Sequence, residues 1–302
     1  MSETGRDAVA IIGSGGIGGY LAGELVTAGR DVTLCVRTPF DRLTIESGGT
    51  TRDVEVRLAT DPGEVRPVRW ILLTTKAQDT AGAQPWLEAL TGPGTTLVVV
   101  QNGVDHVERA GPVAGSARIV PAIIYCSVER DRPGHVVHHG AARMIVPTSE
   151  ASAGFAQLFA GTAFEIVEEQ DFVTAAWRKL CNNLVGNAIT ALTLRRGIVF
   201  QEAAVLDLAR EILLEALAVS RAEGARLTRT EIDQSHAGLG RFGPEAGTSM
   251  LYDRLAGRPL EHEALTGALV RAADRHGIPV PVNRTLLALL GAVSGQKLRA
   301  VR

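Results

Sequence analysis

A glycine-rich loop near the start of the sequence limits the folds open to this chain more than any other feature. The segment IIGSGGIGGYLAGEL spaces Gly13, Gly15 and Gly18 as G-x-G-x-x-G, directly after an apolar run at 8–12 and at the start of a helical pattern that ends near Ala28. The first glycine permits a tight turn, the second lets backbone N–H groups approach a pyrophosphate, and the third lets the helix pack closely on the strand.

The context of this loop favours dinucleotide binding over its alternatives. Glycine-rich turns also arise for packing alone, and methyltransferases contain similar loops. Here, however, a strand, a turn, a helix and a second apolar run at 31–36 follow one another within about 30 residues. The helix N-terminus adds positive potential for a phosphate. We therefore predict a dinucleotide-binding loop made of Gly13, Ser14, Gly15, Gly16, Ile17 and Gly18.

The pattern of apolar runs predicts two domains of different class. Short runs separated by helical patterns, which favour a parallel sheet buried on both faces, lie at 8–12, 31–36, 70–75, 95–100 and 119–126. Shorter strand-like segments and a helix near 152–160 follow. Beyond Asp171 the helix-period segments are 172–192, 202–224, 261–277 and 282–293. We expect an α/β Rossmann-type dinucleotide-binding domain over 1–169 and an all-α C-terminal domain over 170–302.

The residue after the second apolar run indicates which dinucleotide binds. NAD sites usually place Asp or Glu there for the ribose 2′-hydroxyl, whereas an arginine accommodates the 2′-phosphate of NADP. Arg37 occupies this position in TLCVRTP, and Asp31 lies at the opposite end of the run. The sequence therefore favours NADPH. The alternative is that Arg37 is an ordinary solvated arginine.

Composition excludes several classes of function. A net charge of −2 gives no indication of a nucleic-acid or membrane partner, and no apolar run approaches the roughly 20 residues that span a bilayer. The charged start MSETGRD is unlike a signal peptide. Cys35, Cys126 and Cys181 lack CxxC spacing, so we expect reduced thiols in a cytoplasmic protein.

The histidines of HVVHHG raise the question of a metal site. On a strand, His135, His138 and His139 would be divided between the two faces, and we expect no cysteine or acidic partner beside them. We therefore expect no metal.

A polar row interrupts an otherwise apolar helical segment, AAWRKLCNNLVGNAITAL at 175–192. Lys179, Asn183 and Asn187 are spaced i, i+4 and i+8, so on a helix they form one row. Such a row is either a solvated face or a face turned to a ligand. Apolar residues surround the row widely, and the asparagines lower helix propensity, yet the residues alone leave the two interpretations equally favoured.

With these motifs the chain resembles the ketopantoate (2-dehydropantoate) 2-reductase family over nearly its whole length. The resemblance rests on GSGGIG, LLTTKAQDT, VVVQNGV, WRKLCNNLVGN, and SMLYDRLAGRPLEHEALTGALV followed by HGIPVPVN. It implies a reductase of pantothenate biosynthesis that transfers a hydride from NADPH to a 2-oxo acid, ketopantoate first among the candidates. The helical domain is a candidate for the face of a homodimer, although a single sequence identifies no interface.

The resemblance assigns substrate and catalytic roles by position. Lys179 matches a general acid, Asn183 and Asn187 match substrate-binding asparagines, and Ser249 matches a serine that binds the substrate carboxylate. Glu261 matches a catalytic-site glutamate close to the cofactor ribose and the lysine. Hydride transfer leaves an alkoxide that needs charge stabilisation and a proton, and a partly buried lysine ammonium in a cleft between domains supplies both.

Cofactor contacts follow from the same resemblance. Lys76 and Asn102 match cofactor-binding residues, with Asn102 also near the substrate. Both come just after predicted strands, where ligands bind in open α/β sheets. Ser127 falls near a further cofactor-contacting position.

The chain departs from the family pattern beside the predicted substrate row. Ala188 stands where proline is usual, and a further substrate-binding asparagine has no counterpart in TLRRGIV, which carries Arg195 and Arg196. An arginine near the cleft would favour a second carboxylate on the substrate. The alternatives are therefore a reductase of another 2-oxo acid or ketone, and a non-catalytic NADP(H)-binding sensor, against which the retention of Lys179, Ser249 and Glu261 argues.

Overall fold

The computed structural model describes residues 8–296, so the charged first residues, on which the expected absence of a signal peptide depends, lie outside the described part. The described chain divides into two compact units. One holds residues 8–101 and 105–172, and the other holds 102–104 and 173–296. The segment 102–104, which lies within the first predicted domain by sequence, thus packs with the second unit.

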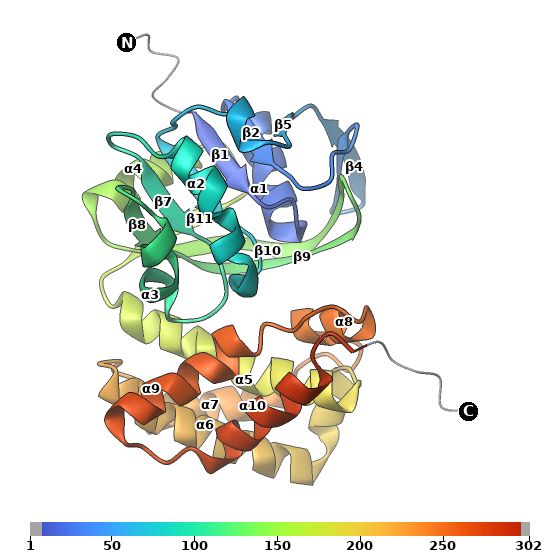
Figure 1. Cartoon of the computed structure of the whole chain (residues 1–302). Coiled ribbons are helices and arrows are strands. Elements are labelled where there is room, and N and C mark those ends of the chain that lie inside the picture. The colour runs from blue at the N-terminus through green and yellow to red at the C-terminus, as the bar shows by residue number, and fades with distance from the viewer. Residues whose placement is uncertain (1–7, 297–302) are drawn as a thin grey trace. The chain divides into compact units, whose positions relative to one another are not determined.

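A six-stranded sheet forms the centre of the first unit (Figure 1). Its strands are all parallel and lie in the order β5-β2-β1-β6-β7-β8. Their bounds are β1 (Val9–Ile12), β2 (Val32–Cys35), β5 (Arg57–Ala59), β6 (Trp70–Leu73), β7 (Thr96–Val99) and β8 (Arg118–Pro121). This is the order of a doubly wound dinucleotide-binding sheet, and it reverses between β1 and β6. Ligands bind at that reversal, outside the carboxyl ends of the strands.

Helices cover both faces of the parallel sheet because successive side chains of each strand point to opposite faces. Val9 and Ile11 of β1 pack in the same core as α1 (Gly16–Thr27), whereas Ala10 and Ile12 pack in the core that contains α2 (Gln84–Leu90) and α3 (His106–Ala110). Both faces of the sheet are therefore buried, as its continuous apolar runs predict.

A second sheet packs against α1 and completes the first unit. Its order is β11-β10-β3-β4, with β9 paired to β10 in a long hairpin (Figure 1). The bounds are β3 (Leu43–Ser47), β4 (Thr50–Val54), β9 (Ile123–Arg132), β10 (His135–Pro147) and β11 (Glu165–Glu169). Helix α4 (Glu150–Leu158) lies between β10 and β11 in the chain. The apolar run 119–126 is therefore two strands, β8 and β9, in different sheets, where the sequence suggested one.

The histidine expectation needs one correction. His135 Nδ1 lies 2.6 Å from Asp131 Oδ1 and its Nε2 lies 3.0 Å from Glu46 Oε1, so the prediction of no acidic partner was wrong. Because Glu46 belongs to β3, the pairing of β3 with β10 brings it there. Among residues 8–296, no group of three or more His, Cys, Asp or Glu side chains could hold a metal ion.

The second unit is helical and has its own apolar core, to which α5, α6 and α9 each contribute several buried residues. Its helices are α5 (Phe172–Thr193), α6 (Ala203–Ala222), α7 (Arg229–Leu239), α8 (Ser249–Leu255), α9 (Ala268–His276) and α10 (Pro281–Val293). A π-helical turn, Glu263–Gly267, leads into α9. Short 3₁₀ turns elsewhere are Pro62–Glu64, Ala77–Asp79, Ala81–Ala83, Gly111–Val113 and Gly197–Gln201.

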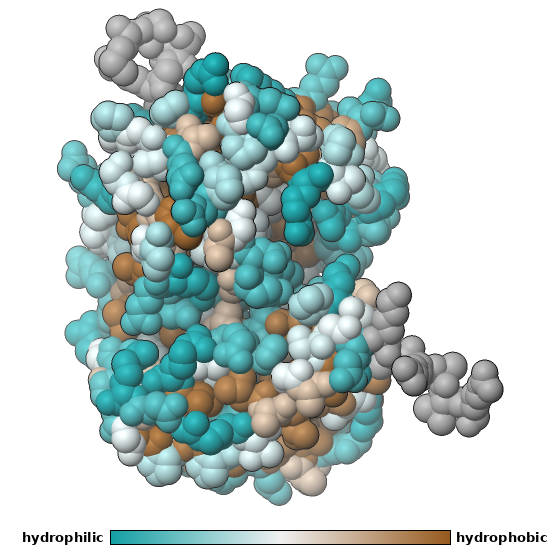
Figure 2. All heavy atoms as spheres, in the orientation of Figure 1, coloured by the Kyte–Doolittle hydropathy of each residue, from teal (hydrophilic) through white to brown (hydrophobic). Residues whose placement is uncertain are grey.

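Hydrophilic residues cover most of the face drawn in Figure 2, and hydrophobic ones show in smaller patches between them. No helix within residues 8–296 is long and apolar enough to cross a membrane.

Candidate active site

The glycine loop takes the conformation that its pattern requires. Gly13 has φ +108°, a region that favours glycine, and its N–H donates to Cys35 O at 3.1 Å. A Cβ on Gly18 would lie 1.9 Å from Gly13 O and 2.4 Å from Thr74 Oγ1, so no larger residue fits there. Both contacts come from the ends of neighbouring strands, β1 and β6. The start of α1 is thereby drawn close against the crevice of the sheet.

The same loop has the features of an anion site. Among the residues that the structure describes, nothing lies within 4 Å of the position of a Gly15 Cβ, so protein packing does not explain this glycine. Gly15 caps α1 without a side-chain hydrogen bond, and the first turn of α1 carries no acidic residue. The first N–H groups of a helix are unpaired within it and attract negative charge. These residues fit a dinucleotide pyrophosphate.

Strand β9 runs beside this loop and adds a cation that the sequence did not suggest. Arg130 Nη1 donates to Ser14 O at 3.2 Å. A Cβ on Gly16 would lie 3.1 Å from Val128 O, which shows how closely β9 approaches. Ser127, predicted to contact the cofactor, is exposed on this strand directly before Val128. Arg130 went unnoticed because it lies 116 residues from Ser14 in the chain.

Arg37 lies after β2, two residues beyond its last residue, Cys35. Its side chain is 91% exposed, and Nη2 lies 4.0 Å from Asp79 Oδ2. Asp79 ends the 3₁₀ turn Ala77–Asp79, which Lys76 begins as its N-terminal cap. The structure thus brings Arg37 near the turn that follows β6, where Asp79 places a negative charge beside it.

The polar row lies on α5 as the spacing indicated. Lys179 and Asn183 are half-buried and Asn187 is buried, 6% exposed. Asn187 Oδ1 accepts hydrogen bonds from Met250 N at 3.1 Å and from Ser249 Oγ at 3.3 Å. Because its oxygen faces these donors, its amide nitrogen is turned the other way, and within residues 8–296 no acceptor engages that nitrogen. Asn187 is therefore fixed as a hydrogen-bond donor.

A second contact fastens α8 to α5. Thr248 caps α8 by accepting from Leu251 N at 3.2 Å, and its hydroxyl lies 2.7 Å from Thr190 Oγ1. Ser249 is the first residue of α8 and is exposed. The structure therefore brings Ser249 to Asn187, one of the predicted substrate-binding residues.

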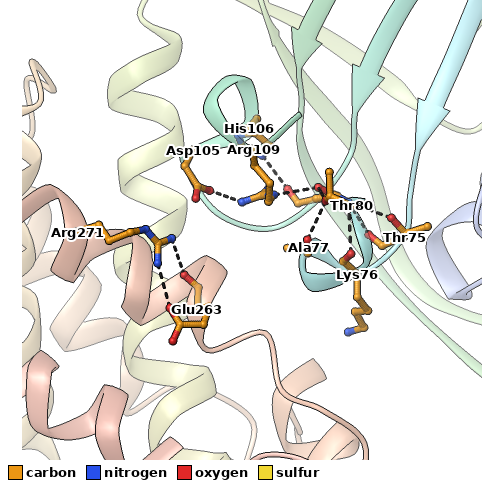
Figure 3. A network of polar contacts seen from close by, with 10 residues as sticks. Thr75, Lys76, Ala77, Thr80, Asp105, His106, Arg109, Glu263 and Arg271 are labelled. Atoms are coloured by element: carbon orange, nitrogen blue, oxygen red, sulfur yellow. Dashed lines mark hydrogen bonds and ion pairs between the residues drawn. The ribbon is translucent and has the colours of Figure 1, made fainter. Parts of the chain in front are cut away.

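Glu261 and Asn102 form another pair of predicted residues. Asn102 Nδ2 donates to Glu261 Oε2 at 3.1 Å, and Glu261 is only 6% exposed. Glu261 lies just before the π-helical turn. The first residue of that turn, Glu263, accepts a hydrogen bond from Arg271 Nη1 at 3.0 Å (Figure 3). Single π-helical turns are rare and are often found at functional sites.

Arg195 and Arg196 are engaged elsewhere. Arg195 forms an ion pair with Glu202, and Arg196 Nη1 donates to Glu245 O at 2.8 Å. The Arg196 guanidinium also lies over the Tyr252 ring, 6.0 Å from its centroid.

Cys181, on the buried side of α5, packs in the core, and burial raises the pKa of its thiol to about 12.

The parallel sheet, the reversal of its strand order and the glycine loop are typical of a dinucleotide-binding protein, here with a helical second unit. Comparison with known proteins agrees over both halves. Residues 9–150 match the family described as ketopantoate reductase PanE/ApbA, and residues 171–294 match its C-terminal counterpart. The chain therefore belongs to the ketopantoate reductase PanE/ApbA family and is an oxidoreductase of this type. The predicted fold class and family are confirmed.

Individual relatives resemble the chain from end to end. A 2-dehydropantoate 2-reductase of Caulobacter vibrioides is 39% identical over 95% of this chain and 99% of its own length. One of Mycobacterium tuberculosis is 39% identical over 95% of this chain and 97% of its own. A solved ketopantoate reductase of Staphylococcus aureus, described as dimeric, superposes with a TM-score of 0.87 at 27% identity, covering 95% of this chain and 98% of that one.

Proposed function

We propose that this protein reduces 2-dehydropantoate to pantoate with NADPH, a step of pantothenate biosynthesis in the cytoplasm. The observation that carries the proposal is the row on α5, where Lys179 and Asn183 are half-buried and Asn187 is fixed as a donor by α8. A solvated face would not need a buried asparagine whose oxygen is already engaged. The 39% identity to 2-dehydropantoate 2-reductases over almost the whole chain supports the choice of substrate.

The residues divide the chemistry between binding and proton transfer. NADPH, when bound, supplies the hydride that adds to the keto carbon. The Lys179 ammonium stabilises negative charge developing on the keto oxygen and then gives that oxygen its proton, so that the ketone becomes a secondary alcohol. Asn183 and Asn187 donate hydrogen bonds to the substrate oxygens. The Ser249 hydroxyl turns from Asn187 Oδ1 to donate to the substrate carboxylate, while Met250 N keeps that oxygen engaged.

The remaining residues hold the cofactor. Gly13 to Gly18 and the N-terminus of α1 receive the pyrophosphate, and Lys76 and Ser127 add contacts along the dinucleotide. Arg37 receives the 2′-phosphate, which is the basis for NADPH over NADH. Asn102 and Glu261, which bond to each other, orient the ribose and the nicotinamide end.

The test is NADPH oxidation at 340 nm with 2-dehydropantoate, beside NADH, a panel of other 2-oxo acids, and Lys179→Ala. We expect saturable turnover that prefers NADPH and falls by about 10²–10⁴-fold without the lysine. Arg178→Gln is the matched control, since Arg178 lies next to Lys179 on α5 but is exposed and bonded to Glu231.

Other outcomes would correct the proposal in defined ways. Turnover only of a different 2-oxo acid would keep the reaction and replace the substrate. NADPH binding without turnover of any 2-oxo acid would favour a sensor. The proposal also includes a homodimer, as described for the S. aureus relative, and sedimentation of the same preparation would reveal it as twice the mass of the chain.

A further inference from the structure

Gln101 occupies a buried position between two loops that carry proposed cofactor-binding residues. It follows β7, directly before Asn102, and is 5% exposed. Its side chain reaches the turn after β6, where Nε2 donates to Thr75 O at 3.1 Å and to Thr80 Oγ1 at 3.0 Å. Thr75 and Thr80 are the two ends of that turn, so a single amide fastens both.

The orientation of the Gln101 amide is set from both sides. Arg109 Nε donates to Gln101 Oε1 at 3.2 Å, and a guanidinium can only donate. Thr75 O, on the other side, can only accept. An amide satisfies these two neighbours in one orientation, whereas a carboxylate would face the Thr75 carbonyl with an oxygen.

Helix α3 holds Gln101 by its backbone as well. His106 Nε2 lies 2.8 Å from Gln101 O, and Arg109 forms an ion pair with Asp105. His106, Arg109 and Thr80 converge on one network in Figure 3. The backbone of Gln101 is thereby held to α3 within the first unit.

The turn that Gln101 fastens presents the proposed cofactor contacts. Asp79 N donates to Lys76 O at 2.9 Å, and Thr80 Oγ1 donates to Ala77 O at 2.8 Å, so the turn is closed internally. The Lys76 side chain extends away from the network, while its backbone remains in it (Figure 3). The position of the Lys76 side chain thus depends on the turn.

We propose that Gln101 is a positioning residue for dinucleotide binding, which acts by holding the turn 75–80 so that Lys76 meets the cofactor. This inference rests on the proposed function. Part of the affinity for NADPH would then depend on a buried glutamine that does not itself contact the cofactor.

A double-mutant cycle separates this role from a merely structural one. We compare Gln101→Met, Lys76→Met and the double variant, measuring the NADPH dissociation constant by fluorescence together with KM, kcat and Tm. Gln101→Met should weaken NADPH binding about tenfold, because a buried network of donors and acceptors loses its partner. In the Lys76→Met background it should weaken binding less than about twofold, since residues that act through one another are not additive.

The control is Gln84→Met, which should leave NADPH binding unchanged. Gln84 is an exposed residue of α2, and its side chain donates to Glu88 in the same helix. Should Gln101→Met not fold, Gln101→Glu, of the same shape, takes its place with the same expectation. An equal loss in both Lys76 backgrounds would overturn the positioning role alone. Failure of the wild-type protein to bind NADPH would remove the proposed function and this inference together.

Discussion

Asp79 places a negative charge beside the arginine that we assign to the 2′-phosphate. The Arg37 and Asp79 side chains are 91% and 44% exposed and 4.0 Å apart, so the pair contributes little stability by itself. A bound 2′-phosphate would compete with Asp79 for Arg37 and would be repelled by it. NADH carries no such phosphate. The acidic residue should therefore reduce the preference for NADPH.

Asp79→Asn should raise that preference. We expect kcat/KM with NADPH to increase about threefold while the value with NADH stays the same, a size typical of exposed charge pairs. The increase should shrink at high salt, where exposed charges are screened. Steady-state kinetics with both cofactors at low and high ionic strength measure it. Glu108→Gln, at an exposed position of α3, matches the charge change and should alter neither value. A shift toward NADH in Asp79→Asn would contradict the assignment of Arg37.

Residues of the site could be predicted from the sequence where their signal is local. The glycine loop, Arg37 and the α5 row each depend on spacing within a single element or turn. Arg130 and Gln101 could not be found in this way, since their partners are 116 and 26 residues distant. Such contacts depend on which strands become neighbours. The pairing of Asn102 with Glu261, 159 residues apart, is of the same kind.

At the scale of elements, the strands of the parallel sheet were predictable because both of their faces are buried. The second sheet was not predictable, because some of its strands consist mostly of polar residues. Strand β4 has the sequence TTRDV, and four of the five residues in this strand are exposed or half-buried. Helix α7, which has one buried residue, Ile232, was missed for the same reason. The helices with wide apolar stripes, α5, α6 and α10, lie close to their predicted bounds.

Helix α7 depends on polar contacts at its start, and this dependence gives it a measurable response to pH. Thr228 and Glu231 form a capping box, and Arg178 of α5 donates to Glu231 Oε1 at 2.7 Å. The hydrogen bond from Arg178, together with those from Thr228, lowers the pKa of Glu231 from 4.5 to about 2. The ionised carboxylate therefore stabilises the fold above about pH 4.5, and this stability is lost as the pH falls through about 2.

Glu231→Gln should accordingly be destabilising at pH 6 and much less so at low pH. We expect a decrease of about 0.5–1 kcal/mol in the free energy of unfolding at pH 6, because solvent screens this pair and glutamine retains part of the capping box. Urea denaturation at pH 6 and pH 3 would show the difference shrinking. Asp233→Asn, whose carboxylate pairs with Arg229 on the exposed side of α7, is the control and should differ little at either pH. A penalty that grows toward pH 3 would refute the argument.

For the whole molecule, two buried cysteines report on the two units separately. Cys35 lies in the first unit, where its carbonyl accepts from Gly13 N, and Cys181 lies in the core of the second. Burial raises the pKa of each thiol to about 12, so neither reacts unless its surroundings open. The rate of alkylation at each thiol therefore measures opening of one unit.

NADPH should protect Cys35 more than Cys181. At about 100 times its dissociation constant, a ligand that binds only the folded state slows opening about 100-fold. Because the glycine loop belongs to the unit of Cys35, we expect the larger part of this protection there. Mass spectrometry of alkylation in a Cys126→Ser background, with and without NADPH, gives both rates. Equal protection of the two thiols would mean that the chain opens as one cooperative body.

The segment Asn102–Val104 bears on where the chain can be cut. Val104 packs against the core of the helical unit, and the Asn102 amide bonds to the buried Glu261 carboxylate. A fragment that starts at Val173 would contain each helix from α6 to α10 but would lack these three residues, and Glu261 would lose the Asn102 amide. The helical half is therefore no transplantable module. A chimera that joins the helical half to another dinucleotide-binding half must therefore also include Asn102–Val104. These three residues lie about 70 positions before the junction at Val173.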